Sequence, residues 1–219
     1  MRGGRPAAAG GRWIDVAPER LPRWLENFGV RHDGWTASGL TAIGGDGATA
    51  LFEPAPGAAP AADLAELVRD APEPRRLGLV LARKGAIAVG LFDGPDLVAS
   101  KVDTHYVQGR TAAGGWSQQR FARRRDNQAK AAAADGAAIV GRLLLPEVRT
   151  ISALVTGGDR AAVDAVLAAR ELAALAGLRA ERFLDVPEPR HAVLVAAVAQ
   201  ARAVRILVRE PEVRTPRPA

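Results

Sequence analysis

The sequence predicts an α/β protein, in which a mixed β-sheet with flanking helices is preceded by a small α+β unit. Three observations support this fold class. Runs of β-type residues alternate with amphipathic stretches over residues 75–209, the order typical of a sheet with packed helices. Residues 54–62 are rich in proline and alanine, the composition of a linker. A chain of 219 residues is long enough for one or two domains with a proper core.

Composition limits the classes of function. The formal net charge is +6, from 30 Lys and Arg against 24 Asp and Glu, which favours nucleic acid or another acidic partner. The chain has no cysteine, which excludes disulfides, thiol nucleophiles and Fe–S clusters and fits a reducing compartment. We therefore expect a cytoplasmic protein.

The ends of the chain and its apolar runs suggest no membrane partner. No stretch reaches about 18 uninterrupted apolar residues, the length that a spanning helix needs. The first residues carry arginines but lack the apolar segment of a signal peptide. We expect residues 1–12 to be a disordered leader and residues 210–219 to be a disordered tail.

Residues 13–72 are predicted to form the small α+β unit with its linker. A helix is expected over Pro18–Phe28, with Gly29 ending it, because apolar residues recur there at helical spacing: Leu21, Trp24, Leu25 and Phe28. Strands are expected over Trp35–Ile43 and Ala48–Phe52, around a Gly-Gly-Asp-Gly turn.

Tryptophans offer a core for this unit. Trp13, Trp24 and Trp35 are expected to pack together, and stacking on nucleic-acid bases is their alternative role. A short helix over Asp63–Asp70 follows, and the prolines after it mark a domain boundary.

From residue 75 the pattern becomes β-rich. Leu77–Arg83 and Ala86–Phe92 read as two strands of a tight hairpin, and Asp96–Val107 reads as a third antiparallel strand. The third strand leads into a glycine-containing loop.

A long helix is predicted from about Ser117 to Leu145. Its second half carries an apolar stripe, and its first half is nearly all polar, so the second half should be anchored and the first half should project. The stripe consists of Ala129, Ala132, Gly136, Ile139, Val140 and Leu143.

Strands and helices alternate after this long helix. Strands are expected over Thr150–Thr156, Glu181–Val186 and Val204–Arg209, and helices over 160–176 and 190–202. We expect all three strands to continue the sheet of the domain at 75–209.

The best candidate site lies where the glycine loop meets the basic helix. Gly114 and Gly115 free the backbone, and Ser117 is a favoured helix cap. Gln118 and Gln119 follow; a carboxamide has no useful pKa but can orient a water molecule. Backbone N–H groups of such a loop can stabilise an oxyanion. The cations beside them suit a polyanion, and they are Arg110, Arg120, Arg123, Arg124, Arg125 and Lys130.

Other chemistries have weaker support in the sequence. The histidines lie far apart without metal-ligand spacing, so we expect no metal and no cofactor. Gly157-Gly158-Asp159 reads as a turn with a helix cap rather than as a phosphate loop. Asp103 and His105 share a strand face, and with Ser117 they would form a hydrolytic triad, although no Gly-x-Ser-x-Gly elbow surrounds that serine.

These residues resemble a known family. Gln108-Gly-Arg110, Gly114-Gly115 and Arg120-Phe121-Ala122-Arg123 resemble the central domain of eukaryotic and archaeal class-1 peptide release factors, where a Gly-Gly-Gln loop precedes a basic helix. Here Trp116 stands in place of that glutamine, and the pair Gln118-Gln119 begins two residues later. This displaced glutamine is similar to that of the Vms-like release factor family, in particular its actinobacterial branch. The resemblance covers about residues 75–209.

The resemblance implies a metal-independent peptidyl-tRNA hydrolase that acts on the large ribosomal subunit and releases nascent chains from stalled ribosomes. Gln118 or Gln119 would position water against the ester, beside Gly114, Gly115 and Ser117. The cations and Trp116 would contact rRNA or tRNA, and we expect a monomer. Two alternatives remain: a non-catalytic ribosome- or RNA-binding module in which Trp116 stacks on a base, and a ribosome-independent Ser117 hydrolase.

Overall fold

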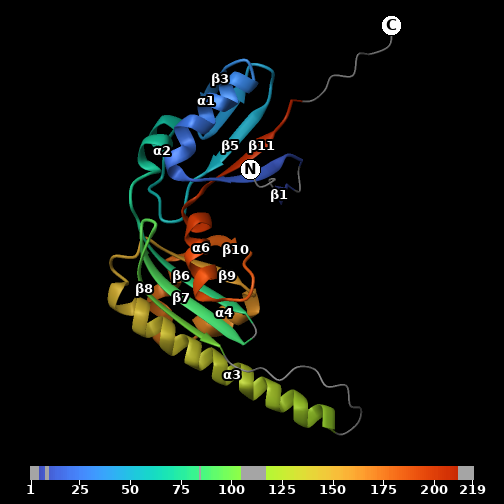
Figure 1. Ribbon diagram of the computed structural model, residues 1–219, viewed down its shortest axis with the longest axis vertical. Coiled ribbons are helices and arrows are strands. Elements are labelled where there is room, and N and C mark those ends of the chain that lie inside the picture. The colour runs from blue at the N-terminus through green and yellow to red at the C-terminus, as the bar shows by residue number, and fades with distance from the viewer. Residues whose placement is uncertain (1–4, 8–9, 84, 105–116, 212–219) are drawn as a thin grey trace. The chain divides into compact units, whose positions relative to one another are not determined.

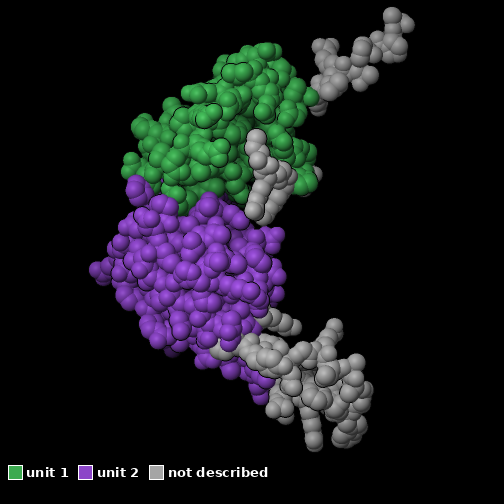
Figure 2. Space-filling model, viewed as in Figure 1, with its two compact units in different colours: residues 1–73, 202–219 green, residues 74–201 purple. Residues whose placement is uncertain are grey.

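A computed structural model of the chain describes residues 5–7, 10–83, 85–104 and 117–211, with the backbone alone for residues 5 and 117–126. Two units can be distinguished in it (Figure 2). Unit 1 consists of Met1–Glu73 together with Arg202–Ala219, and unit 2 consists of Pro74–Ala201. Both chain ends therefore belong to unit 1.

Unit 1 contains a six-stranded antiparallel sheet in the order β1-β2-β11-β5-β4-β3 (Figure 1). Its strands are β1 (Arg5–Pro6), β2 (Arg12–Val16), β3 (Trp35–Ser38), β4 (Thr41–Gly44), β5 (Thr49–Glu53) and β11 (Val204–Arg209). Residues on β2, β5 and β11 alternate between the core and the other face, as their period of two requires.

Helices cover one face of this sheet. They are the 3-10 turn η1 (Pro18–Arg20), α1 (Leu21–Arg31) and α2 (Leu64–Asp70). The predicted apolar face of α1 is confirmed, because Leu21, Leu25 and Phe28 are buried against Phe52 of β5. Trp24 stacks on Phe28 with ring centroids 5.4 Å apart.

Three expectations for unit 1 are wrong. The helix does not end at Gly29 but continues to Arg31, because the left-handed φ values that follow a helix end come at Asp33 and Gly34 and not at Gly29. Residues 35–43 form two strands, β3 and β4, with Gly39 at positive φ between them. The three tryptophans do not form a common core, since Trp35 is 38% exposed and Trp13 is half-buried.

The last strand also differs from expectation. β11 does not continue the sheet of the 75–209 region but pairs with β2 and β5 inside unit 1. Its core-facing residues, Val204, Ile206 and Val208, are buried with the helices of unit 1. The C-terminal segment thus closes the sheet that the N-terminal segment begins.

Unit 2 contains the predicted mixed sheet, in the order β10-β9-β6-β7-β8. Its strands are β6 (Arg76–Arg83), β7 (Ala86–Asp93), β8 (Asp96–Thr104), β9 (Ala153–Gly158) and β10 (Arg179–Leu184). The hairpin strands β6, β7 and β8 are antiparallel, as expected, and β6, β9 and β10 are parallel.

Helices cover both faces of this sheet (Figure 1). Side chains of β6 alternate between the two resulting cores: Val80 and Ala82 face α3 (Ser117–Leu144) and α4 (Arg160–Leu167), while Leu79 and Leu81 face α6 (His191–Arg202). The helix expected over 160–176 is broken into α4, a 3-10 turn η3 (Arg170–Leu172) and α5 (Ala173–Ala176). The break brings Leu172 and Leu175 into the core beside α3.

Candidate functional site

The predicted glycine loop connects the edge strand of unit 2 to its longest helix. β8 is an edge strand, and its last residue, Thr104, pairs with Ala86, which also pairs with Arg83 of β6. The connection to α3 therefore leaves the sheet at the end that carries the β6–β7 hairpin. Arg110, Gly114, Gly115 and Trp116 lie in this connection, outside the described residues.

The other predicted site residues belong to the start of α3. Ser117 is the first residue of the helix, and Gln118 and Gln119 follow in its first turn. The helix runs from Ser117 to Leu144, within one residue of the prediction at each end. By helical spacing, Arg120, Arg123 and Arg124 share one side of α3, and Gln118 falls on another.

The second half of α3 is anchored to the sheet. Its buried residues are Gly136, Ala137, Ile139, Val140 and Leu144. Gly136 makes the closest approach, since an added Cβ would lie 2.9 Å from Val166 Cγ2 of α4 and 3.1 Å from Ile87 Cδ1 of β7. A larger residue at this position would push α3 away from the sheet.

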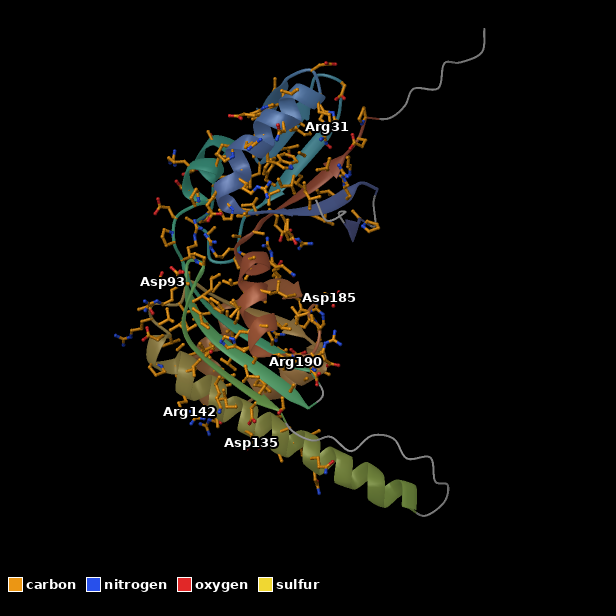
Figure 3. All side chains as sticks on the ribbon, viewed as in Figure 1. Arg31, Asp93, Asp135, Arg142, Asp185 and Arg190 are labelled. Carbon is orange, nitrogen blue, oxygen red and sulfur yellow. The ribbon has the colours of Figure 1, made fainter. Side chains whose placement is uncertain are left out.

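Exposure changes abruptly along α3. Residues 127–131 are all exposed, and burial begins beyond them. The predicted apolar stripe therefore starts too early, because Ala129 is exposed and Ala132 is only half-buried. Asp135 and Arg142 mark the solvent side of the anchored half (Figure 3).

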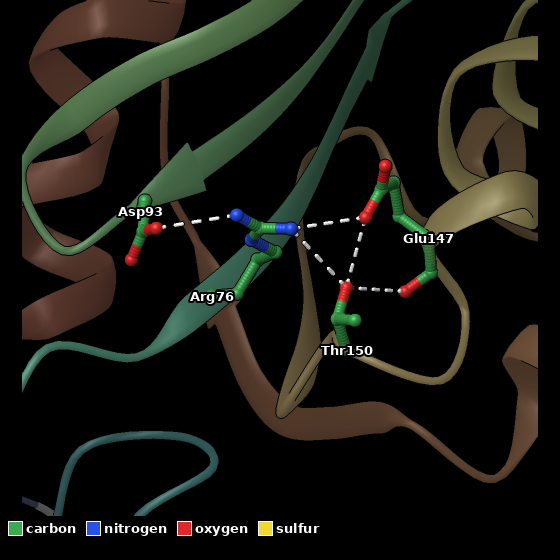
Figure 4. A network of polar contacts seen from close by, with 4 residues as sticks. All are labelled: Arg76, Asp93, Glu147 and Thr150. Carbon is green, nitrogen blue, oxygen red and sulfur yellow. Dashed lines mark hydrogen bonds and ion pairs between the residues drawn. The ribbon is translucent and has the colours of Figure 1, made fainter.

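A polar network holds the turn that follows α3. Arg76, at the start of β6, donates one hydrogen bond of 3.0 Å to Glu147 and pairs with Asp93 at 3.2 Å (Figure 4). Glu147 belongs to the 3-10 turn η2 (Leu145–Glu147), and Thr150 donates to its backbone carbonyl at 2.9 Å. The network ties the end of the helix to two strands.

Positive charge is concentrated around the start of α3. Unit 2 contains 18 Lys and Arg against 12 Asp and Glu, a net +6, whereas unit 1 contains 12 of each. Residues 110–130 alone contain six Lys and Arg against one Asp, a net +5. Nearly the whole net charge of the protein thus lies in this loop and the first half of its helix.

The structure tests one of the two alternative chemistries, the phosphate loop, but not the hydrolytic triad. Gly157 and Gly158 end β9, and Asp159 caps α4 by accepting the Ala162 N–H at 3.0 Å, as the turn-and-cap interpretation predicts. In the proposed triad, Asp103 accepts the Thr104 N–H at 2.9 Å, while His105 and the Ser117 side chain lie outside the described part of the chain. That hypothesis remains untested.

Metal centres and membrane-spanning helices are two further kinds of site that the described residues do not offer. These residues contain no group of three or more His, Cys, Asp or Glu side chains placed to hold a metal ion. None of the helices described is both long enough and apolar enough to cross a bilayer.

The sequence analysis did not identify the part that Gly136 and Arg76 play in holding α3 and the turn after it against the sheet. The signal for Gly136 was present, because a glycine inside an apolar helical stripe indicates close packing. Arg76 gave no signal, because its partners are 17 and 71 residues away in sequence.

A family model matches the chain over residues 75–207, with the description Actinobacteria/chloroflexi VLRF1 release factor. The match includes the whole candidate site and extends into β11. A search of the curated proteins finds no match.

Two solved structures are similar to part of the chain. One is the crystal structure of the archaeal translation termination factor aRF1, with a TM-score of 0.43 and 19% identity, covering 57% of this chain and 34% of that chain. The other is described as an archaeal protein, with a TM-score of 0.38 and 17% identity, covering 64% of this chain and 39% of that chain. The chain therefore spans between a third and two fifths of their length.

Proposed function

Because this chain belongs to the Actinobacteria/chloroflexi VLRF1 release factor family, we propose that it is a peptidyl-tRNA hydrolase that releases nascent chains from stalled large ribosomal subunits. The coarser function, a release factor of translation, follows from the family. The substrate, the reaction and the residues that perform it are the proposal.

One observation carries the proposal: two glutamines occupy the first turn of a helix whose rear half is anchored and whose front half carries most of the net charge of the protein. Arginine binds phosphate through a planar, bidentate fork. A row of such groups suits the phosphate-lined interior of a ribosome, and the two uncharged amides lie in the first turn of the same helix.

The chemistry requires little from the protein. The Gln118 carboxamide oxygen accepts a hydrogen bond from a water molecule, whose oxygen attacks the carbonyl carbon of the ester. The bond to the tRNA ribose oxygen breaks, and that oxygen takes up the proton that the attacking water loses. Backbone N–H groups at Gly114, Gly115 and the helix start stabilise the oxyanion.

Cations and Trp116 perform the binding part of the proposed function. Arg110, Arg120, Arg125 and Lys130 neutralise phosphates of rRNA or tRNA together with Arg123 and Arg124, and Trp116 stacks on a base. Lys130, whose side chain is described, is exposed and available for such a contact.

Release of peptide from purified large subunits carrying peptidyl-tRNA tests the proposal. We expect Gln118→Ala to lower the release rate by about 100-fold or more, the effect of losing one transition-state hydrogen bond, while binding to the subunit persists. Gln128→Ala is the matched control, because Gln128 is an exposed glutamine further along the same helix.

Other outcomes identify the alternatives. Loss of release in Gln119→Ala but not in Gln118→Ala would assign the reaction to Gln119. Wild-type protein that binds subunits but releases no peptide would be the non-catalytic module. Release from free peptidyl-tRNA that a serine-directed probe blocks would favour the Ser117 hydrolase.

A further inference from the structure

The helices α3 and α4 lie side by side in unit 2 and run in the same direction. An added Cβ at Gly136 of α3 would lie 2.9 Å from Val166 Cγ2 of α4. An added Cβ at Gly141, further along α3, would lie 3.5 Å from Leu172 Cδ2 in the turn that follows α4. The start of α4 therefore lies beside the part of α3 that precedes Gly136.

Lys130 stands on the side of α3 that faces α4. Seven residues make almost two helical turns, so Lys130 shares its side of the helix with Ala137, which is buried in the core that α3 and α4 form together. Lys130 itself is exposed. By the same spacing, Arg123 occupies a position on this side two turns nearer the helix start. Two cations of the basic segment thus stand on the α4 side of α3.

Arg160, the first residue of α4, adds a third cation next to them. It precedes Val166 by six residues, as Lys130 precedes Gly136 by six, so Arg160 and Lys130 lie at the same level of the paired helices. Arg160 is exposed, and its guanidinium carbon lies 4.3 Å from the ring centroid of Phe183. This cation–π contact restricts the side chain and lowers the entropy that it would lose on binding a ligand.

The charge of Arg160 is not neutralised within the protein. No carboxylate of the described residues forms an ion pair with it. The two carboxylates nearest in sequence are engaged elsewhere, since Asp159 accepts the Ala162 N–H at 3.0 Å and Asp164 pairs with Arg179 at 2.7 Å. A cation in the first turn of a helix also gains nothing from the helix dipole. The stability of α4 therefore does not explain this arginine.

The other flank of α3 has a different charge pattern. Lys101 of β8 pairs with Val89, which faces the core beneath α3. Asp103 stands two residues further along the same strand face, so a negative charge accompanies the positive one there. Only the α4 flank continues the positive charge of residues 110–130 without an unengaged acid beside it in sequence.

RNA phosphate is the complementary ligand for the α4 flank. The guanidinium of arginine matches a phosphate through its planar fork, and an exposed cation that binds a polyanion releases counterions from it. We propose that a strand of rRNA in the large subunit runs along the α4 side of α3 and that Arg160 binds one of its phosphates. This inference rests on the proposed function for the source of the RNA, and it extends the contact beyond residues 110–130.

Binding of the full chain to purified large subunits without tRNA, measured over a range of salt concentrations, tests the contact. One phosphate contact contributes roughly 0.7–0.9 to the slope of log K against log salt. Arg160→Gln should therefore weaken binding by about five- to eightfold at 0.1 M salt and should converge with the wild type near 1 M salt. Arg160→Lys keeps the charge and should keep the slope.

Two control variants remove one exposed cation each from elsewhere in unit 2. Arg170→Gln removes an arginine from η3, at the far end of the α4 segment, and Lys101→Gln removes the cation of the β8 flank. Both should leave the slope unchanged, and the thermal melts of all four variants should match that of the wild type.

Unchanged binding of Arg160→Gln, with wild-type binding intact, overturns the inference alone. An equal loss in Arg170→Gln overturns it as well, because net charge and not position would then decide binding. A loss in Lys101→Gln but not in Arg160→Gln would place the RNA on the other flank of α3. A wild type that binds a single-stranded RNA oligonucleotide with an Arg160-dependent slope, but no large subunits, would overturn the proposed function and support the phosphate contact. Binding to neither would overturn both.

Discussion

Asp46 joins two parts of unit 1 through one carboxylate. It accepts the Ala48 N–H at 2.9 Å and hydrogen-bonds His32 Nδ1 at 2.8 Å. The His32 side chain is buried, and its ring centroid lies 4.5 Å from that of Phe28. The carboxylate thus fastens the glycine-rich β4–β5 turn to the end of α1.

This arrangement gives a pH dependence with a definite sign. The Ala48 N–H and then the His32 ring lower the pKa of Asp46 below its ordinary value, so the folded protein binds the proton more weakly than the unfolded chain does. The stabilisation is present above the unfolded pKa, near pH 4, and is lost as pH falls through the lower folded pKa.

We therefore expect Asp46→Asn to lower the melting temperature at pH 6 and to approach the wild type at acidic pH. Thermal melts over this range check it. Asp135→Asn, which removes an exposed carboxylate of α3, should show no such convergence. A gap between Asp46→Asn and wild type that widens on acidification would contradict the assignment.

Single residues were the least predictable from sequence. The apolar face of α1 could be predicted, because spacing alone decides which side of a helix is buried. The positions of Trp13 and Trp35 could not, since their burial depends on strand order. Among the site residues, Gln118 and Gln119 were placed at the start of a helix correctly, whereas their roles stay a prediction.

At the level of elements, α3 depends on one close contact. Gly136 has no room for a methyl group beside Val166, whose γ-carbon is held on a stiff β-branched side chain. Gly141, five residues later, has room: an added Cβ would lie 3.5 Å from Leu172 Cδ2, an ordinary contact distance.

The two glycines form a matched pair. Gly141→Ala should stabilise the protein by about 0.5–1 kcal/mol, because alanine favours a helix over glycine. Gly136→Ala has the same helix preference but should be less stable than Gly141→Ala by about 1–3 kcal/mol, the cost of overpacking. Urea denaturation measures both, and equal stabilisation would mean that α3 is not tightly seated at residue 136.

Most helices and strands could be predicted from the sequence, whereas the pairing of strands within the sheets could not. The strands and helices of unit 2 follow from apolar periodicity, and the long helix was placed within one residue at each end. β11 has the same alternating pattern that a strand of either sheet would have. It pairs with β2, which lies almost 200 residues earlier in the chain. The spacing of apolar residues along β11 carries no information about so distant a partner.

At the scale of the whole molecule, the net positive charge of the protein lies in unit 2 and not in unit 1. Unit 1 has no net charge, while residues 110–130 of unit 2 carry a net +5 from six cations and one Asp. Electrostatic binding to RNA should therefore depend on where an arginine lies and not only on the total charge.

This division can be tested with two variants of equal charge. Arg123→Gln/Arg124→Gln and Arg20→Gln/Arg23→Gln each remove two positive charges, the first pair from α3 and the second from the exposed surface of η1 and α1. Each phosphate contact contributes roughly 0.7–0.9 to the slope of log K against log salt. The α3 variant should lower the magnitude of that slope for large-subunit binding by about 1.5, and the unit 1 variant should leave it unchanged. Equal effects of the two variants would mean that ribosome binding responds to net charge alone, and the basic segment at the start of α3 would then lose its special role.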